Sequence, residues 1–247
     1  MIRFKSVTLH YGGGDVVQEI DLHVRPGESK VVLGPSGVGK STILKAILGL
    51  LKPETGEIYV QGHAISKLPE QELVKIRLGM AMVFQHGALF DSMTVGQNVS
   101  YRIRERQLMN PEATSKRVQE VLKFVGLEGA LKLKPAQLSG GMKKRVAIAR
   151  ALAPNPEIFL FDEPTVGLDP INSYNVEQLI LKLKTRKVTM MIVTHDVQSA
   201  MRLADTIVML HQGKFIFEGT PEELKKSTDN RVRAFLDPST ASTLDSL

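Results

Sequence analysis

The feature that most constrains the fold is a glycine-rich run, Gly34-Pro35-Ser36-Gly37-Val38-Gly39-Lys40-Ser41, with Thr42 after it. It follows the apolar stretch 29–33, which is typical of a strand, and precedes apolar residues at helical spacing. The pattern G-x-x-x-x-G-K-[ST] predicts a loop whose N–H groups surround a phosphate, with the next helix pointing its positive end at it. We expect Lys40 to reach β- and γ-phosphates, Ser41 to offer a hydroxyl to Mg²⁺, and Thr42 to lie near an α-phosphate. Because a strand precedes the loop and a helix follows it, a chance match is disfavoured.

A second motif places two carboxylates at the end of an apolar strand. The run 158–161 is wholly apolar and is followed at once by Asp162 and Glu163. Open α/β sheets bind ligands at the carboxyl ends of their strands. Asp162 therefore suits Mg²⁺ binding through water, and Glu163 suits polarisation of a water that attacks a γ-phosphate. A helix-capping pair ahead of Pro164 is the alternative, and the phosphate-binding loop disfavours it.

A second helix end suited to an anion is predicted at Leu138-Ser139-Gly140-Gly141-Met142. Ser139 is a good N-cap, and Gly140 and Gly141 leave the first N–H groups accessible. An ordinary capped helix from Ser139 to Ala153 explains this stretch alone equally well. That helix would carry Met142, Val146 and Ala149 on one face, and Lys143 to Arg145 on the other.

Three single polar residues lie at or near expected strand ends. Gln85 follows the apolar run 80–84, Asp169 comes shortly after Glu163, and His195 follows the run 190–194. Each alone is typical of a polar cap. The other histidines have no metal-ligand spacing and are interpreted as surface residues: His10, His23, His63, His86 and His211.

Composition excludes several classes of protein. Of 247 residues, 43% are hydrophobic and 23% charged, which excludes a disordered chain, and the lack of cysteine excludes disulfides and thiol chemistry. The charge of +6 is scattered, which favours a solvated surface over dedicated DNA binding and is compatible with membrane apposition. No signal-peptide core is present, and the longest uncharged stretch, 79–90, is too short for the roughly 20 residues that span a bilayer.

The order of expected elements predicts an α/β fold. Alternating apolar residues before residue 25 predict antiparallel strands with a slip in phase after Phe4. Strands and helices then alternate, which is typical of a parallel sheet. Expected helices cover 40–51, 67–78, 111–125, 139–153 and 176–183; expected strands cover 57–61, 158–161, 188–193 and 206–210, with a hairpin through Gln212-Gly213. The Ser- and Thr-rich tail, 237–247, is predicted to be mobile.

Taken together, the motifs resemble those of the nucleotide-binding subunit of ABC transporters, over about residues 1–225. Gly34 to Thr42 matches the Walker A loop, Leu138 to Met142 the signature, and Ile158 to Glu163 Walker B with the catalytic glutamate. Further matches are Tyr11 for the adenine-stacking aromatic, Gln85 for the Q-loop, Gly167 to Asp169 for the D-loop and His195 for the switch histidine. Met142 departs from the family's usual Gln, but Ser139 and the backbone N–H groups remain, so an active ATPase is expected.

This resemblance implies a P-loop NTPase (RecA-like) core with a mixed, mainly parallel sheet. It also implies an N-terminal antiparallel β subdomain and an α-helical subdomain at about 86–153, in one nucleotide-binding domain, 1–236. In the implied homodimer, the Gly34 loop of one chain and Ser139 of the other enclose ATP and Mg²⁺. Implied catalytic residues are Glu163, His195, Gln85 and Lys40; implied metal ligands are Ser41, Gln85 and Asp162; implied nucleotide contacts are Tyr11, Gly34, Pro35, Ser36, Gly37, Val38, Gly39, Lys40, Ser41, Thr42, Gln85, Asp162, Ser139, Gly140, Gly141 and Asp169.

Three further stretches resemble the Mla (maintenance of lipid asymmetry) or MCE-associated ATPases. They are the segment 85–90 with the sequence Gln-His-Gly-Ala-Leu-Phe, the signature ending in Met142, and the tail 229–236. The resemblance implies phospholipid transport through a transmembrane permease, with MCE-domain and STAS-domain proteins as partners. The chain would sit on the cytoplasmic face of the inner membrane, and the tail would reach a neighbouring ATPase subunit. A frayed amphipathic end is the alternative interpretation of that tail.

Other functions remain open at this point. An ABC importer ATPase for a polar solute such as an amino acid would share the catalytic motifs. A DNA-repair or ribosome-acting ABC protein is disfavoured, because no coiled coil separates Gln85 from Leu138 and only one cassette is present. A P-loop protein without turnover is disfavoured by the intact Lys40, Asp162, Glu163 and His195. No nucleic-acid partner is expected.

Overall fold

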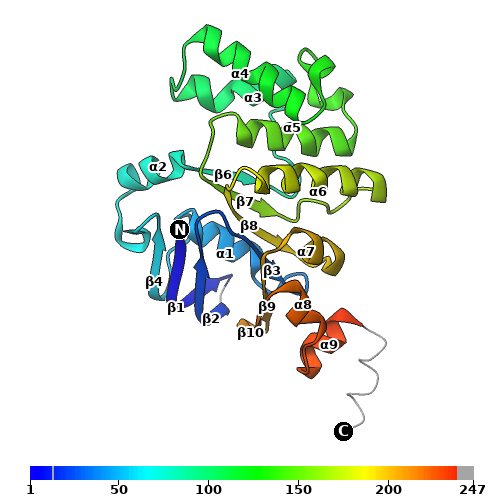
Figure 1. Ribbon diagram of the computed structural model, residues 1–247. Coiled ribbons are helices and arrows are strands. Elements are labelled where there is room, and N and C mark those ends of the chain that lie inside the picture. The colour runs from blue at the N-terminus through cyan, green and yellow to red at the C-terminus, as the bar shows by residue number, and fades with distance from the viewer. Residues whose placement is uncertain (13, 238–247) are drawn as a thin grey trace. The chain divides into compact units, whose positions relative to one another are not determined.

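The computed structural model describes residues 1–12 and 14–237, without the side chains of Tyr11 and Asp15. The chain divides into two compact units. The first comprises Met1–Arg77 and Thr189–Leu247, and the second is Leu78–Val188. Figure 1 labels their elements. Most of the predicted mobile tail lies outside the described residues.

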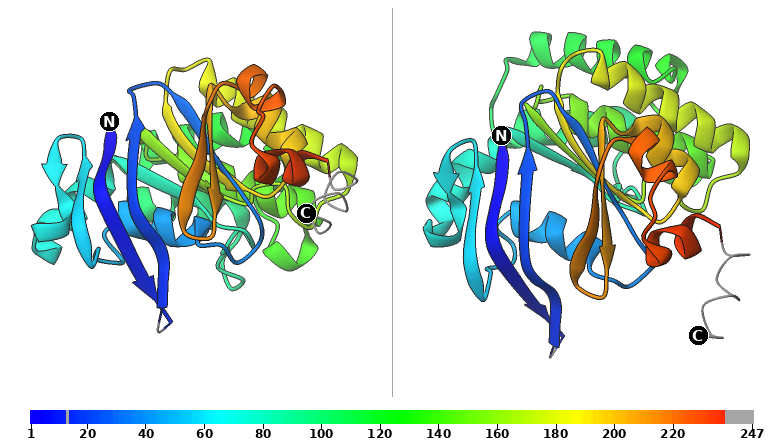
Figure 2. Two further views of the ribbon diagram at one scale, coloured as in Figure 1. Left: turned by 90° about the horizontal axis from the view of Figure 1, so that it is seen from below. Right: turned by 60° about the horizontal axis from the view of Figure 1, so that its bottom comes forward.

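The first unit contains the predicted antiparallel strands. β1 (Ile2–Tyr11) pairs with both β2 (Gly14–Val24) and β4 (Thr55–Val60), and β4 pairs with the short β5 (His63–Ala64). The predicted slip is a register shift in β1 between Phe4 and Val7, where Ser6 has a φ of 45°. Because of this shift, Phe4 and Val7 are both buried although they are three positions apart, a spacing that places side chains on opposite faces of a regular strand. Figure 2 shows β1 and β2 running side by side as a long ribbon.

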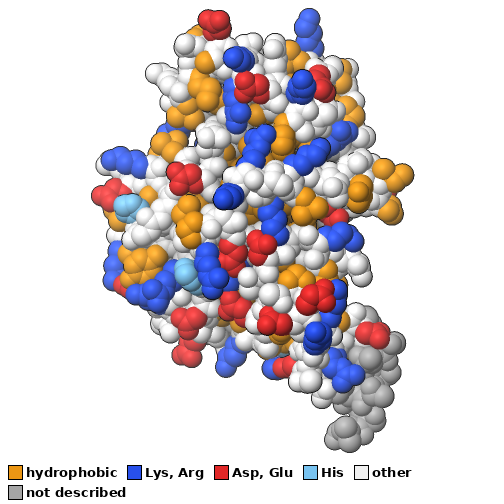
Figure 3. All heavy atoms as spheres, viewed as in Figure 1, with side chains coloured by type: hydrophobic (Ala, Val, Ile, Leu, Met, Phe, Trp, Pro, Cys, Tyr) orange, Lys and Arg blue, Asp and Glu red, His pale blue; other side chains and the backbone are white. Residues whose placement is uncertain are grey.

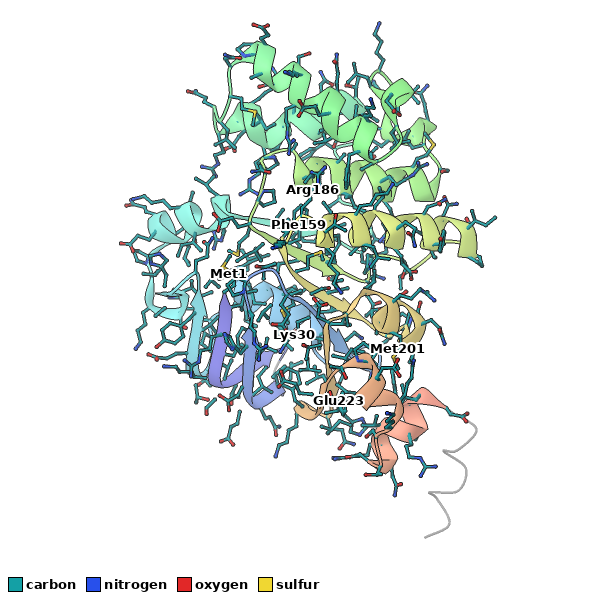
Figure 4. All side chains as sticks on the ribbon, viewed as in Figure 1. Met1, Lys30, Phe159, Arg186, Met201 and Glu223 are labelled. Carbon is teal, nitrogen blue, oxygen red and sulfur yellow. The ribbon has the colours of Figure 1, made fainter. Side chains whose placement is uncertain are left out.

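A mixed set of strands completes the first unit. β3 (Ser29–Leu33) lies between β8 (Thr189–Thr194) and β9 (Thr206–His211), parallel to both, and β10 (Lys214–Gly219) returns antiparallel to β9 through the predicted hairpin. β3 and β8 are wholly buried, as expected for parallel strands. Lys30 is the charged exception in β3, and its ammonium pairs with Glu218 at 2.5 Å (Figure 4).

The helices of the first unit are short. They are α1 (Lys40–Ile47), α2 (Glu70–Leu78, whose last residue belongs to the second unit), α7 (Val197–Leu203), α8 (Pro221–Lys225) and α9 (Asn230–Leu236), with a 3₁₀ turn at Ile65–Lys67. The predicted helix 40–51 is four residues too long, because Leu48 caps α1 and Gly49 has a φ of 66°. α7, α8 and α9 were not predicted.

The second unit joins two parallel strands to four helices. β6 (Met80–Val83) pairs with β7 (Ile158–Asp162), and the helices are α3 (Val95–Glu105), α4 (Pro111–Phe124), α5 (Gly140–Leu152) and α6 (Pro170–Lys184), with 3₁₀ turns at Glu128–Ala130 and Pro135–Gln137. α3 packs against α4 and α5 (Figure 1). The buried Phe159 of β7, labelled in Figure 4, stacks on Phe161 with ring centroids 5.8 Å apart.

Two observations concern the surface. Within the described residues, no helix is both long enough and apolar enough to cross a membrane. Figure 3 shows Lys and Arg side chains interspersed with Asp and Glu over the face in view, as the predicted mixed-charge surface requires.

Candidate functional site

The glycine-rich loop follows β3 and leads directly into α1, as predicted. The Lys40 side chain lies back over this loop, where its ammonium group donates to the carbonyl oxygens of Gly34 and Pro35, each at 2.8 Å. Only 5% of Lys40 is exposed, so its charge is placed by the loop itself. A buried ammonium held among backbone groups is a strong electrostatic partner for an anion.

Two glycines of the loop cannot be replaced without a steric conflict. A Cβ on Gly34 would lie 2.4 Å from the carbonyl oxygen of Leu210, and one on Gly39 would lie 2.5 Å from Val16 Cγ1. Gly39 also has a φ of 107°, a region that disfavours other residues. No side chain caps α1 and its first turn has no acidic residue, so the positive helix end is suited to a bound anion.

His195 belongs to the same sheet edge as the loop. Leu33 of β3 pairs with Thr194 of β8 in parallel register, so Gly34 and His195 both follow the carboxyl ends of neighbouring strands. His195 is exposed, and Asp196 after it caps α7 by accepting from the N–H groups of Gln198 and Ser199. The first unit thus carries the predicted residues from Gly34 to Thr42 together with His195; the side chain of Tyr11 lies outside the description.

In the second unit, Gln85 and the two carboxylates share an edge for the same reason. Val83 of β6 pairs with Phe161 of β7, and Gln85 and Glu163 each come two residues later. Asp162 is half-buried and Glu163 only 8% exposed. Glu163 has a φ of 46°, which costs roughly 1–3 kcal/mol in a residue other than glycine and persists only where the surroundings enforce it.

Lys144 of α5 is a member of this set that the sequence did not reveal. Its ammonium donates to the carbonyl oxygen of Gln85 and, at 3.2 Å, to that of Glu163. The prediction that Lys143, Lys144 and Arg145 share a solvated face is wrong for Lys144, which is 5% exposed, whereas Lys143 is exposed. Burial lowers the pKa of Lys144 to about 8, although the nearby Asp162 and Glu163 carboxylates oppose that shift.

The start of α5 is capped as predicted. The Ser139 hydroxyl accepts from the N–H of Met142 at 3.3 Å, and Ser139 and Gly140 are exposed. Position 141 has no room for a larger residue, because a Cβ on Gly141 would lie 2.1 Å from Oδ1 of Asn172 in α6. No signal in the sequence identified Asn172.

Asp169 caps α6 and is tied to the same asparagine. Its carboxylate accepts from the N–H of Asn172 at 3.0 Å and from the side-chain amide of Asn172 at 2.6 Å. These bonds lower the pKa of Asp169 below its usual range. Asn172 therefore links the predicted D-loop to the start of α5 within the second unit.

The residues predicted to bind a metal ion carry oxygen donors. Ser41 in the first unit offers a hydroxyl, and Gln85 and Asp162 in the second offer amide and carboxylate oxygens, which are the ligands that Mg²⁺ prefers. Among the described residues, no cluster of three or more histidine, aspartate or glutamate side chains is arranged to hold a metal ion. Of the remaining histidines, four are exposed and His211 is half-buried.

Comparisons with a family model and with known proteins agree on one family. Residues 17–166 match the ABC transporter family. The chain is 40% identical to the intermembrane phospholipid transport system ATP-binding protein MlaF of Haemophilus influenzae, over 96% of this chain and 90% of that protein. It is 39% identical to the probable ribonucleotide transport ATP-binding protein mkl of Mycobacterium leprae, over 95% of this chain and 68% of that protein.

The fold is also similar to that of solved structures. A dimeric ATP-binding cassette in a post-hydrolysis state, with ADP and Pi bound, superposes with a TM-score of 0.82 at 38% identity. The match covers 90% of this chain and 99% of that one. The likeness therefore extends over both units, each of which carries part of the predicted site.

Proposed function

The chain belongs to the ABC transporter family, and from this we propose that it is the ATP-hydrolysing subunit of a phospholipid transporter. The observation that carries the proposal is a buried glutamate, Glu163, held in a strained backbone conformation at a strand end directly after Asp162. Strained backbone positions persist only where the surrounding structure enforces them, and they cluster at functional sites.

The first unit supplies the groups that hold the nucleotide. Gly34, Pro35, Ser36, Gly37, Val38 and Gly39 offer backbone N–H groups to the phosphates, and Lys40 neutralises charge on the β- and γ-phosphates. Thr42 lies at the α-phosphate and Tyr11 stacks on adenine. The proposed Mg²⁺ ligands are Ser41 of this unit and Gln85 and Asp162 of the second, and the ion would neutralise charge on the phosphates when it is bound.

Hydrolysis requires a positioned water and support for the charge that develops on the γ-phosphate. Glu163 orients the water and takes its proton at a carboxylate oxygen, a role worth typically 10²- to 10⁴-fold in rate. Gln85 and His195 contact the γ-phosphate, since each follows the carboxyl end of a strand. Burial of Glu163 keeps bulk water from competing for its carboxylate.

The complete site is proposed to need two copies of the chain. Ser139, Gly140 and Gly141 of one copy bind the phosphates held by Gly34 to Thr42 of the other, and Asp169 lies at the same interface. Three features of the chain support this: the exposed Ser139, the Gly140 beside it, and the helix start that they leave open. The similar cassette with ADP and Pi bound is itself dimeric.

The proposed cargo is phospholipid, as in the name of the MlaF relative. The permease would contact the segment 86–94, whose carbonyl oxygens accept from the Asn98 and Arg150 side chains. Phe90 of this segment and Tyr101 of α3 are both partly exposed, with ring centroids 4.7 Å apart. We place the subunit peripherally on the cytoplasmic face of the inner membrane, with MCE-domain and STAS-domain proteins in the same complex.

A polar cargo is the second candidate, because the mycobacterial relative is named for ribonucleotide transport. That candidate keeps the ATPase chemistry and changes only the permease and its substrate. Identification of the co-purifying partners separates the two.

The role of Glu163 is tested with Glu163→Gln. This variant should retain ATP, accumulate as an ATP-bound dimer and lose about 10²- to 10⁴-fold in turnover, because the amide cannot accept the proton. Steady-state phosphate release and size-exclusion chromatography with ATP measure both effects. Glu157→Gln, at the exposed residue just before the same strand, is the matched control. Retention of most turnover in Glu163→Gln would contradict the assigned role.

A further inference from the structure

Helix α5 holds the segment that follows β6 at three successive points. Near its start, Lys144 donates to the carbonyl oxygen of Gln85. In the middle, Gly87 packs against the helix, where a Cβ on it would be in ordinary van der Waals contact with Ala147 Cβ, at 3.6 Å. Near the end, Arg150 donates to the carbonyl oxygens of Gly87 and Ala88, at 2.9 and 2.6 Å. The segment 85–88 is therefore fixed to one face of α5 by its backbone.

Lys144 differs from Arg150 because it also reaches a second segment. Its ammonium lies 3.2 Å from the carbonyl oxygen of Glu163, nineteen residues along the chain from Lys144. Two of its three N–H donors thus serve two backbone carbonyls from separate parts of the unit. Among the described residues of the second unit, Lys144 is the one side chain that bonds to the carbonyl oxygens of both Gln85 and Glu163.

Two of the four carbonyls that these cations hold belong to strained positions. Glu163 has a φ of 46° and Ala88 a φ of 48°, and neither is glycine. Such conformations persist only where the surrounding structure over-determines them. The bond from Lys144 to Glu163 and the bond from Arg150 to Ala88 are contacts that do so.

Burying the Lys144 ammonium group costs free energy, and packing alone does not explain why a lysine occupies this position. Lys144 is 5% exposed, and burial lowers its pKa to about 8. A buried ion pair is commonly replaced as a whole by apolar side chains without loss of stability, so a buried cation is weak evidence for a stabilising role. A role in fixing the geometry around it accounts for the ammonium group.

We propose that Lys144 is a positioning residue for ATP hydrolysis, which locks the Q-loop segment and the Glu163 turn into one arrangement by bridging their carbonyl oxygens. The proposal rests on the functions proposed above for Gln85 and Glu163. It assigns no contact between Lys144 and the nucleotide. Loss of the bridge should release both segments together and misplace two groups that act on the γ-phosphate.

The test compares three variants of the full-length chain: Lys144→Met, Lys144→Arg and, as the matched control, Lys143→Met at the exposed neighbouring lysine. Two readouts are needed. Steady-state kinetics give kcat and the KM for ATP, and hydrogen–deuterium exchange follows the amides of residues 85–88 and of Glu163, Thr165 and Val166.

We expect Lys144→Met to lower kcat by about 10- to 100-fold, the scale on which small misplacements of reacting groups act, with KM changed by less than about threefold. Exchange should accelerate in both segments at once. Lys144→Arg should restore a large part of kcat and of the protection, because it keeps a cationic donor. Lys143→Met should match the wild type in both readouts.

The proposal is overturned if Lys144→Met keeps kcat within about twofold of wild type, or if only one of the two segments exchanges faster. Should Lys144→Met fail to fold, as thermal melting would reveal, Lys144→Gln decides by the same criteria, since its shorter amide cannot span both carbonyls. A Glu163→Gln variant that retains turnover would contradict the proposed function, whereas the exchange data on Lys144 would still decide the bridge.

Discussion

At the scale of single residues, adjacent glycines at the start of α5 have different surroundings. A Cβ on Gly141 would lie 2.1 Å from Asn172 Oδ1, whereas one on Gly140 meets only Leu168 Cδ2 at 3.6 Å. Gly141→Ala should therefore cost about 1–3 kcal/mol of unfolding free energy through overpacking, and Gly140→Ala much less. Urea denaturation measures both. Adding Asn172→Ala should recover part of the loss in Gly141→Ala; equal stability of the two single variants would contradict this packing.

Residues that bind phosphate could be predicted from sequence, but those that hold them in place could not. Gly34 to Thr42 are contiguous, so the motif itself determines which groups meet a phosphate. Lys144 and Asn172 act through segments far from them in the chain. Lys144 also sits between Lys143 and Arg145, so its charge alone indicated a solvated face, and only the packing of α5 shows that it is buried.

At the scale of elements, one asparagine organises the loop that precedes α3. Asn98 is fully buried; its side-chain oxygen accepts from the N–H of Phe90, and its amide donates to the carbonyls of Phe90, Met93 and Thr94. Asn98→Ala removes the partner of the Phe90 N–H and of the Met93 carbonyl, whereas the carbonyls of Phe90 and Thr94 keep backbone donors, and the change should cost about 2–3 kcal/mol.

The consequence of Asn98→Ala should be local. Amide exchange should accelerate across residues 88–94, and stimulation of ATPase activity by the permease should fall, because that segment is the proposed contact. Gln119→Ala, on the exposed face of α4, serves as the control. Unchanged exchange in 88–94 would show that other contacts fix the loop.

Helix α9 should lose its cap in acid. Asp229 pairs with the Arg231 guanidinium at 2.6 Å and accepts from the Arg231 N–H, and the side-chain bond above all lowers the pKa of Asp229 to about 2. Since the unfolded value is near 4, the carboxylate stabilises α9 above about pH 4 and this contribution is lost as the pH falls toward 2.

Hydrogen exchange of α9 between pH 2 and 5, corrected for intrinsic rates, checks this dependence. The wild type should lose protection over that range, whereas Asp229→Asn should be less protected at pH 5 and nearly independent of pH. An identical pH profile in the two proteins would exclude Asp229 as the titrating group.

Elements with strong apolar periodicity were predictable, and weaker ones were not. β7 and β8 are uninterrupted apolar runs, and α5 and α6 have helical patterns. α3 was missed although Thr94 and Gln97 form a capping box, because Arg102, Arg104 and Glu105 dilute its apolar stripe of Val95, Val99 and Ile103. α1 was overestimated because the turn at Leu48 and Gly49 depends on backbone conformation, which the continuing apolar pattern conceals.

At the scale of the whole molecule, each chain carries the phosphate-binding loop and the start of α5 in different units. If two copies share each ATP, two inactive variants should complement one another. Lys40→Ala mixed with Ser139→Arg gives heterodimers with one intact site, so a 1:1 mixture should recover up to about a quarter of wild-type turnover. Each variant mixed with itself is the control. Turnover no higher than the sum of the two variants would contradict a shared site.

A pull-down tests whether this ATPase drives a lipid permease, as we propose. The full-length chain would be recovered from detergent-solubilised native membranes, and co-purifying proteins and lipids identified by mass spectrometry. We predict a multi-spanning permease, MCE-domain and STAS-domain proteins, and bound phospholipid. A permease accompanied by a soluble solute-binding protein, or recovery of ribosomes or DNA instead, would contradict the lipid assignment and leave the ATPase chemistry in place.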